Sequence, residues 1–157
     1  MTLLPVNLMI AVAWAAVAGD FSAGTLFLGY VAGFGALYAF SEIYGETQYF
    51  RRTRATFGLM LFFIQDLVKS SVQVASAVLF ANHRGRNRFV EMPLDVESDF
   101  GVMLTANLIT LTPGTLSVDF DPDRRVLLIH AMFADDPEDV ARGLKQEVER
   151  RVIEVLT

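Results

Sequence analysis

The sequence of 157 residues contains no cysteine, so disulfide bonds, thiolate metal sites and thiol catalysis are excluded. Charge is almost missing from residues 1–40, where Asp20 is the one ionised side chain. In the C-terminal half, residues 83–157, fourteen acidic residues outnumber nine basic residues. Nucleic acid is therefore not an expected partner. A disulfide-rich secreted scaffold, a collagen and a disordered chain are excluded as well.

Hydrophobic residues make up 53% of the chain, and they are concentrated near its start. Residues 3–18 and 23–40 are uncharged runs separated by the polar turn at residues 19–22. As helices they would measure about 24 to 27 Å, slightly less than the roughly 30 Å hydrocarbon core of a bilayer. We expect residues 1–40 to form a two-helix transmembrane hairpin. The alternative is a signal peptide cleaved after Ala18, but the positively charged start of a signal peptide is missing.

Small residues recur every four positions in the second run, at Thr25, Gly29 and Gly33. Such spacing allows close approach of another helix, which drives association in lipid. These three residues are candidates for a subunit interface, although the contact could instead be intramolecular, with Ala11 and Ala15.

A third apolar stretch, residues 56–81, is predicted to be an amphipathic helix. One polar stripe runs along it, made of Gln65, Asp66, Lys69, Gln73 and Ser76. Arginine clusters flank it on both sides, at positions 51, 52 and 54 and at positions 84, 86 and 88. Both flanks are therefore expected in the cytoplasm. Residues 41–82 are predicted to be a charged loop and a helix that lies in the membrane interface or re-enters it, with a third span as the alternative.

Asp66 and Lys69 lie one helical turn apart and can form a local ion pair. In a spanning helix they would be candidate ion-path residues. In an interfacial helix they belong to a solvated surface, which is the interpretation that we favour.

Residues 83–157 predict a small cytoplasmic α+β domain with the order β-α-β-β-α. The expected elements are strands at 89–94, 116–120 and 125–133, a helix at 99–110 capped by Ser98, and a terminal helix that begins at Pro137. Thr112-Pro113-Gly114-Thr115 is typical of a type II turn.

The helix at 99–110 is apolar around most of its circumference, so we expect one side of it to meet a protein or a membrane. Candidate subunit-interface residues of this segment are Val102, Leu104, Asn107, Leu108, Pro113 and Gly114.

Residues that could carry chemistry are few. Asp119, Asp121 and Asp123 resemble the start of a calcium loop, but Arg124 stands where that loop needs glycine. His130 lies in an apolar strand, and His83 lies among arginines. No nucleotide, nucleophile or zinc motif is present. We therefore expect neither an enzyme nor a bound cofactor or metal.

A family resemblance lies in Ser-Asp-Phe-Gly at 98–101, Ala-Asn-Leu-Ile-Thr-Leu-Thr-Pro-Gly-Thr at 106–115 and Val-Asp at 118–119. This pattern resembles the MrpE/MnhE family, the E-type subunits of the multi-subunit Na+/H+ antiporter of the Mrp or Mnh type. Pro-Leu-Asp at 93–95 and Glu-Arg-Arg at 149–151 agree with it, so the similarity covers essentially the whole chain.

The resemblance implies a multi-pass protein of the cell membrane that acts as a non-catalytic structural or assembly subunit of a sodium/proton antiporter complex. Its partners would be the other subunits and the lipid bilayer. Two or three short helices cannot enclose an alternating-access pathway by themselves, which agrees with such a role. The alternatives are a direct contribution to the sodium path through Asp66 and Lys69, or a stand-alone membrane-anchored binding module.

Overall fold

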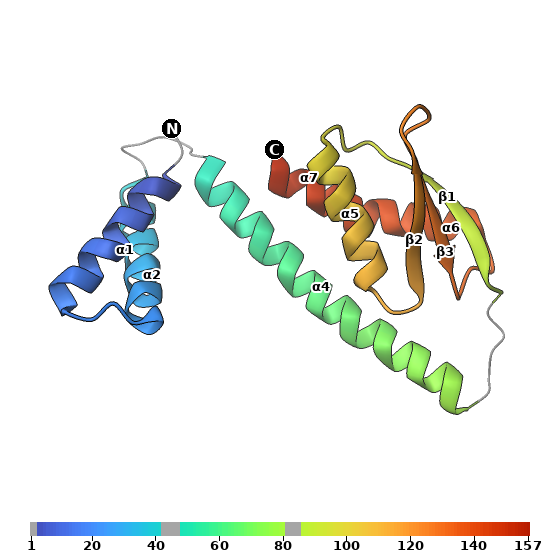
Figure 1. The fold of residues 1–157 in the computed structure, drawn as a ribbon, viewed down its shortest axis with the longest axis horizontal. Coiled ribbons are helices and arrows are strands. Elements are labelled where there is room, and N and C mark those ends of the chain that lie inside the picture. Colours follow the sequence, from blue (N-terminus) through green and yellow to red (C-terminus); the bar gives the residue numbers. More distant parts are fainter. Residues whose placement is uncertain (1–2, 42–47, 81–85) are drawn as a thin grey trace. The chain divides into compact units, whose positions relative to one another are not determined.

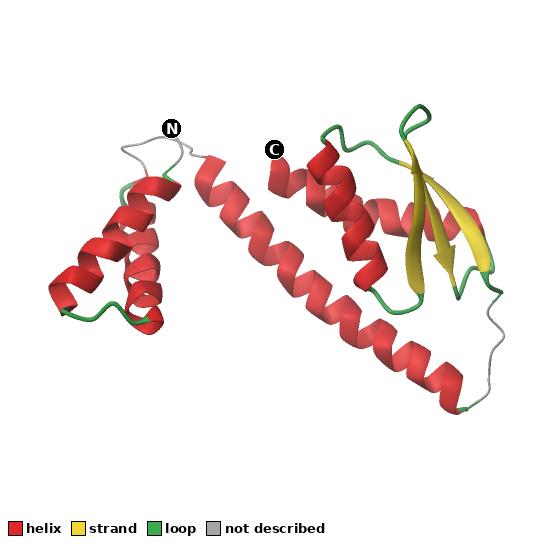
Figure 2. Ribbon diagram, in the orientation of Figure 1, coloured by secondary structure: helices red, strands yellow, loops and turns green. Residues whose placement is uncertain are grey.

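The structure, a computed structural model, describes residues 3–41, 48–80 and 86–157. The chain folds as two compact units, residues 1–54 and 55–157 (Figure 1). Helices form the first unit, whereas the second combines helices with a small sheet (Figure 2). His83 and Arg84, which the sequence places in a basic flank, lie outside the described residues.

The first unit begins with the expected hairpin, helices α1 (Leu4–Ala18) and α2 (Ala23–Ala39). Gly19 ends α1 with a φ of 66°, in the left-handed region that glycine adopts without strain. Ser22 caps α2, because its hydroxyl accepts a hydrogen bond from the Thr25 amide at 3.3 Å. The polar turn thus ends one helix and starts the next, as the sequence predicts.

Helix α4 (Gln48–Leu79) starts in the first unit and continues into the second. It begins eight residues before the predicted position 56. Among the described residues it is the one helix that is long and apolar enough to cross a membrane by length and composition. Helices α1 and α2 are also apolar but are shorter, with 15 and 17 residues.

The second unit contains the predicted order of strands and helices. Strands β1 (Arg88–Pro93), β2 (Thr115–Asp121) and β3 (Val126–Ala131) form an antiparallel sheet in the order β1-β3-β2. Its pairing aligns Val90 with Ile129 and Ile129 with Ser117, and a bulge follows Ser117. Helix α5 (Asp99–Leu111) joins β1 to β2, with Ser98 as its N-cap.

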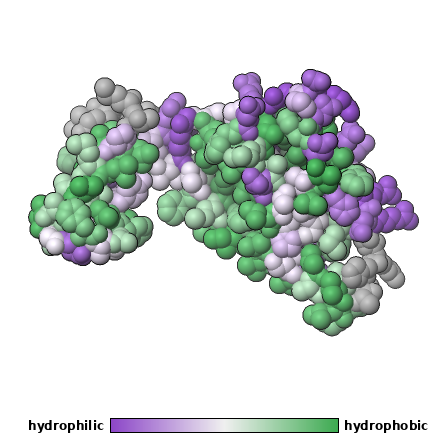
Figure 3. Space-filling model, viewed as in Figure 1, coloured by the Kyte–Doolittle hydropathy of each residue, from purple (hydrophilic) through white to green (hydrophobic). Residues whose placement is uncertain are grey.

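The predicted terminal helix is present but is not uniform. It consists of α6 (Pro137–Leu144), a single π-helical turn η1 (Lys145–Glu149) and α7 (Arg150–Leu156). Together with α5 it covers one face of the sheet, and the core lies between them. The buried core residues include Val90, Met92, Ile109, Leu127, Ile129 and Val148. Hydrophilic residues gather around the β2–β3 turn and α6, and hydrophobic ones along α4 (Figure 3).

Candidate functional site

The small-residue row of α2 lies inside the hairpin. A Cβ atom at Gly29 would lie 2.8 Å from Trp14 Cβ and 3.0 Å from Ala11 Cα, so the α1 backbone passes directly against this glycine. Gly33 is equally close to α1, where a Cβ atom would lie 2.9 Å from Ile10 Cγ2 and nearer still to Asn7 Oδ1. Both glycines therefore take part in the intramolecular contact with α1 that the sequence left as an alternative.

Thr25 has a different environment from the two glycines. Its hydroxyl donates a hydrogen bond of 2.5 Å to Asp20 Oδ2, in the turn between α1 and α2. The Asp20 carboxylate also accepts a hydrogen bond from the Ser22 hydroxyl at 2.7 Å and one from the Ser22 amide at 2.9 Å. These hydrogen bonds, of which the bond from Thr25 has the largest effect, hold the pKa of Asp20 below its usual value. Thr25 thus belongs to the structure of the turn.

A buried polar group that the sequence reading missed connects the hairpin to the start of α4. Asn7 is fully buried, and its Nδ2 donates to the Tyr49 hydroxyl at 2.8 Å. The Tyr49 hydroxyl is in turn 3.0 Å from the hydroxyl of Tyr30 on α2. Leu3 and Leu37 pack around Tyr49. Helices α1 and α2 and the start of α4 therefore meet at one hydrogen-bonded cluster.

The candidate ion-path residues have different environments in the structure. Asp66 is half-buried, and Thr112 at the end of α5 donates to its Oδ2 at 3.2 Å. Lys69 is exposed, and the ion pairs found among the described residues do not join it to Asp66. Asp66 therefore lies at a helix contact of the second unit instead of in a local ion pair with Lys69.

Helix α5 divides the predicted interface residues between two environments. Val102 and Leu108 pack against the core of the domain, and Leu104 is half-buried. Asn107 is exposed, and three large apolar side chains of the same helix are exposed with it: Phe100 at 57%, Met103 at 53% and Leu111 at 59%. The predicted second apolar side of this helix is therefore present, although it is formed mainly by other residues than those proposed.

Pro113 and Gly114 form the turn after α5 as predicted. Gly114 has a φ of 97°, and the Thr115 amide donates to the Thr112 carbonyl at 3.2 Å, which are features of a type II turn. Both turn residues are half-buried. The position of a Cβ atom at Gly114 lies 3.5 Å from Val74 of α4, so this turn packs beside α4.

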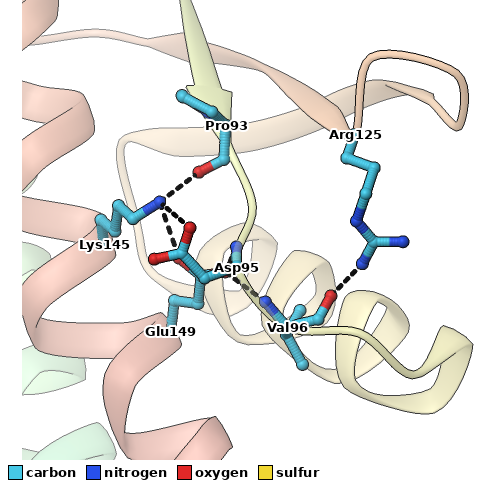
Figure 4. A network of polar contacts seen from close by, with 6 residues as sticks. All are labelled: Pro93, Asp95, Val96, Arg125, Lys145 and Glu149. Carbon is cyan, nitrogen blue, oxygen red and sulfur yellow. Dashed lines mark hydrogen bonds and ion pairs between the residues drawn. The ribbon is translucent and has the colours of Figure 1, made fainter.

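The segment between β1 and α5 is held by charged side chains (Figure 4). Glu149, which is 1% exposed, accepts hydrogen bonds from the amides of Asp95 at 2.5 Å and Val96 at 3.0 Å through one carboxylate oxygen. Lys145 lies 3.8 Å from the other oxygen, 2.8 Å from Asp95 Oδ1, and donates to the Pro93 carbonyl at 2.8 Å. Arg125 donates to the Val96 carbonyl.

This cluster fixes the start of α5 relative to the terminal helix. The π turn is part of the arrangement, since it contains both Lys145 and Glu149 and lets Val148 and Glu149 be buried side by side. Sequence periodicity did not reveal this charged cluster, because a glutamate next to a valine on a regular helix is expected in solvent. The sequence signal for the cluster was the pair of motifs at 93–95 and 149–151, which the structure brings together.

In the described part of the chain, no three His, Asp or Glu side chains are grouped suitably for a metal ion. Asp121 Oδ1 accepts hydrogen bonds from the amides of Asp123 and Arg124, both at 3.0 Å. The acidic segment that resembles a calcium loop is thus a side-chain-stabilised turn. His130 packs its ring against Phe89, with ring centroids 5.4 Å apart.

Comparison with known proteins gives consistent matches. Residues 7–155 match the model of the MNHE family, described as a Na+/H+ ion antiporter subunit. The chain is 31% identical to the Na+/H+ antiporter E1 subunit of Staphylococcus haemolyticus and 32% identical to the corresponding E-type subunit of Alkalihalophilus pseudofirmus. Each alignment covers 95% of this chain and 94% of the relative.

Solved structures agree with this result. A chain in the Mrp complex of Dietzia sp. is 27% identical, with a TM-score of 0.51 over 66% of this chain and 96% of that one. A chain of an archaeal membrane-bound sulfane sulfur reductase shares the fold, with 20% identity and a TM-score of 0.52 over 94% and 97% of the two chains. The protein therefore belongs to the MNHE family, the E-type subunits of the Na+/H+ antiporter.

Proposed function

We propose that this chain is a non-catalytic structural subunit of a sodium/proton antiporter complex in the cell membrane. In this proposal the α1–α2 hairpin spans the bilayer, and the domain that follows faces the cytoplasm. The other subunits of the complex bind the exposed side of α5. Family membership supports the complex, and the apolar hairpin followed by a polar domain supports the arrangement.

The observation that carries the proposal is the exposed apolar side of α5. Phe100, Met103 and Leu111 recur at helical spacing and are each more than half exposed. A small domain rarely leaves large apolar side chains together on one helix unless another surface covers them. The Glu149 cluster holds the segment before this helix, so its orientation is fixed before a partner binds.

Co-purification of the full complex tests the α5 surface. Met103→Asp places a charge in the centre of the exposed side and should lower recovery of the companion subunits at least tenfold. Gln146→Asp, an exposed change of equal charge on the terminal helix, should leave recovery unchanged. Full recovery with Met103→Asp, with the variant protein present at its normal level, would refute docking through α5.

Orientation is tested by labelling from each side of the membrane. The chain has no cysteine, so Thr157→Cys introduces a single thiol. We expect an impermeant maleimide to label it from the cytoplasmic side, because arginine-rich flanks stay in the cytoplasm. Labelling from the outer side would contradict the proposed topology.

The competing role for Asp66 predicts a different result. Because the Asp66 carboxylate accepts a hydrogen bond from Thr112, which Asn can also accept, Asp66→Asn should preserve the packing. We expect sodium/proton exchange in vesicles to remain near the parent rate. Loss of exchange by a fully assembled complex would place Asp66 on the ion path.

A further inference from the structure

Helix α4 has two opposite faces within the second unit. One face packs against the polar domain through Phe62, Asp66 and Val74. Phe62 contacts the core, and the centre of its ring lies 4.4 Å from the guanidinium carbon of Arg151. Asp66 accepts from Thr112, and Val74 lies beside the turn at Gly114. The polar domain thus packs along the middle of α4.

The opposite face of α4 is apolar and open. At 100° per residue its members fall on one side of the helix, away from Asp66. Their exposed fractions range from 50% to 76%. The members of this apolar stripe are Phe57, Met60, Leu61, Ile64, Val68, Val72, Val78 and Leu79. The stripe contains no ionised residue and is about 33 Å long. Hydrophobic surface is visible along α4 in Figure 3.

We propose that α4 lies flat in the membrane interface, with the apolar stripe in the lipid and the polar domain on its water side. This proposal rests on the membrane placement proposed above. It commits to lipid as the partner of the stripe. The exposed residues Gln65 and Lys69 lie along one border of the stripe, where polar side chains meet headgroups.

The contacts of α4 with the polar domain favour an interfacial helix over a spanning one. A span requires about 20 consecutive residues in hydrocarbon. Of the 32 residues of α4, the segment from Phe62 to Val74 lies against the domain. Insertion of this segment would carry the groups packed on it into lipid, including the turn at Gly114 and the Arg151 guanidinium, which the bilayer does not tolerate. Length and hydropathy alone would have selected α4 as the span.

Lipid fits the apolar stripe better than a second protein helix does. Helix contacts in membranes use rows of small residues, as Gly29 and Gly33 do in the hairpin. The stripe consists instead of large aliphatic and aromatic side chains. Moreover, the first turn of α4 belongs to the unit that contains the apolar hairpin, where Tyr49 packs with Leu3 and Leu37.

Spin labelling of the full chain in vesicles of phosphatidylethanolamine and phosphatidylglycerol tests the proposal, because single cysteines can be introduced without removing any. Cysteines at Met60, Ile64, Val68 and Val72 report the stripe, and cysteines at Gln65 and Lys69 report its polar border. We expect the four stripe labels to share one shallow depth, about 5 to 10 Å below the headgroups, with high oxygen collision rates. The two border labels should collide mainly with a water-soluble nickel complex.

Two other outcomes would overturn the proposal. Depth that changes steadily from Met60 to Val72 and passes the bilayer centre would show a spanning helix. Immobile labels that collide with neither oxygen nor nickel, when the complex is present, would show a protein partner on the stripe. The second outcome would leave the proposed function intact, because co-purification of the complex is measured separately.

Discussion

Replacement of Gly33 by alanine should weaken the hairpin, because the added methyl group has no room. Its carbon would lie 2.9 Å and 3.2 Å from two carbons of Ile10, and closer still to Asn7 Oδ1. Gly35 lies two residues further along α2, where a methyl group would meet nothing within 4 Å. Overpacking of a close contact costs about 1 to 3 kcal/mol, whereas alanine in place of an unhindered glycine favours the helix. The difference between Gly33→Ala and Gly35→Ala should therefore be about 1 to 3 kcal/mol.

The assay is unfolding in mixed micelles by increasing sodium dodecyl sulfate, followed through the fluorescence of Trp14. Trp14 is the only tryptophan of the chain, and its Cβ faces Gly29 across the helix contact. We expect the transition of Gly33→Ala to move to lower detergent fraction than that of Gly35→Ala. Equal transitions for the two variants would refute the close α1–α2 contact and return Gly33 to a surface available for a companion protein.

Three further expectations concern the turn and the polar domain. Glu149→Gln should lower the free energy of unfolding by about 1.5 to 3 kcal/mol, the value of hydrogen bonds to a charged group. It should also speed amide hydrogen exchange between β1 and α5. The control Glu154→Gln, at an exposed position, should change neither quantity. Gly114→Val forces a β-branched residue to a φ of 97° and should lower the free energy of unfolding of the polar domain by about 1 to 3 kcal/mol, measured by amide hydrogen exchange of β2 and β3 in increasing urea. The pKa of Asp20, followed by carbon NMR, should lie below 3.8 and rise in Thr25→Val. Since this pKa is lower in the folded hairpin, the stabilisation is present above pH 3.8 and is lost as the pH falls through the folded value.

Local rules were sufficient for most elements of the polar domain. Ser98 caps α5 because its side-chain oxygen accepts a hydrogen bond from the free Gly101 amide, and this position follows from the sequence. Gly114 takes its positive φ because the Pro-Gly pair suits a type II turn. Each of these features depends on neighbours within a few residues, which a sequence pattern records.

Contacts between distant residues were less accessible. Asp66 meets Thr112 across 46 positions, and no periodicity within α4 identifies that partner. The glycines of α2 show the same limit, because a small-residue row suits an internal helix contact and an intermolecular contact equally well. Burial of Glu149 required a π turn, which has no simple sequence signal. For these features the sequence supplied the residue types, and the fold supplied the pairing.

The π turn also makes the number of residues in the terminal helix significant. A π turn closes its hydrogen bonds one residue later than an α turn, so it holds an additional residue between the same two flanks. Deletion of the exposed Gln146 would let η1 become a regular α turn while α6 and α7 kept their faces on the core. The same deletion within α7 would rotate the residues beyond it by about 100°. Natural variation in length is therefore expected at η1 and not in the helices on either side of it.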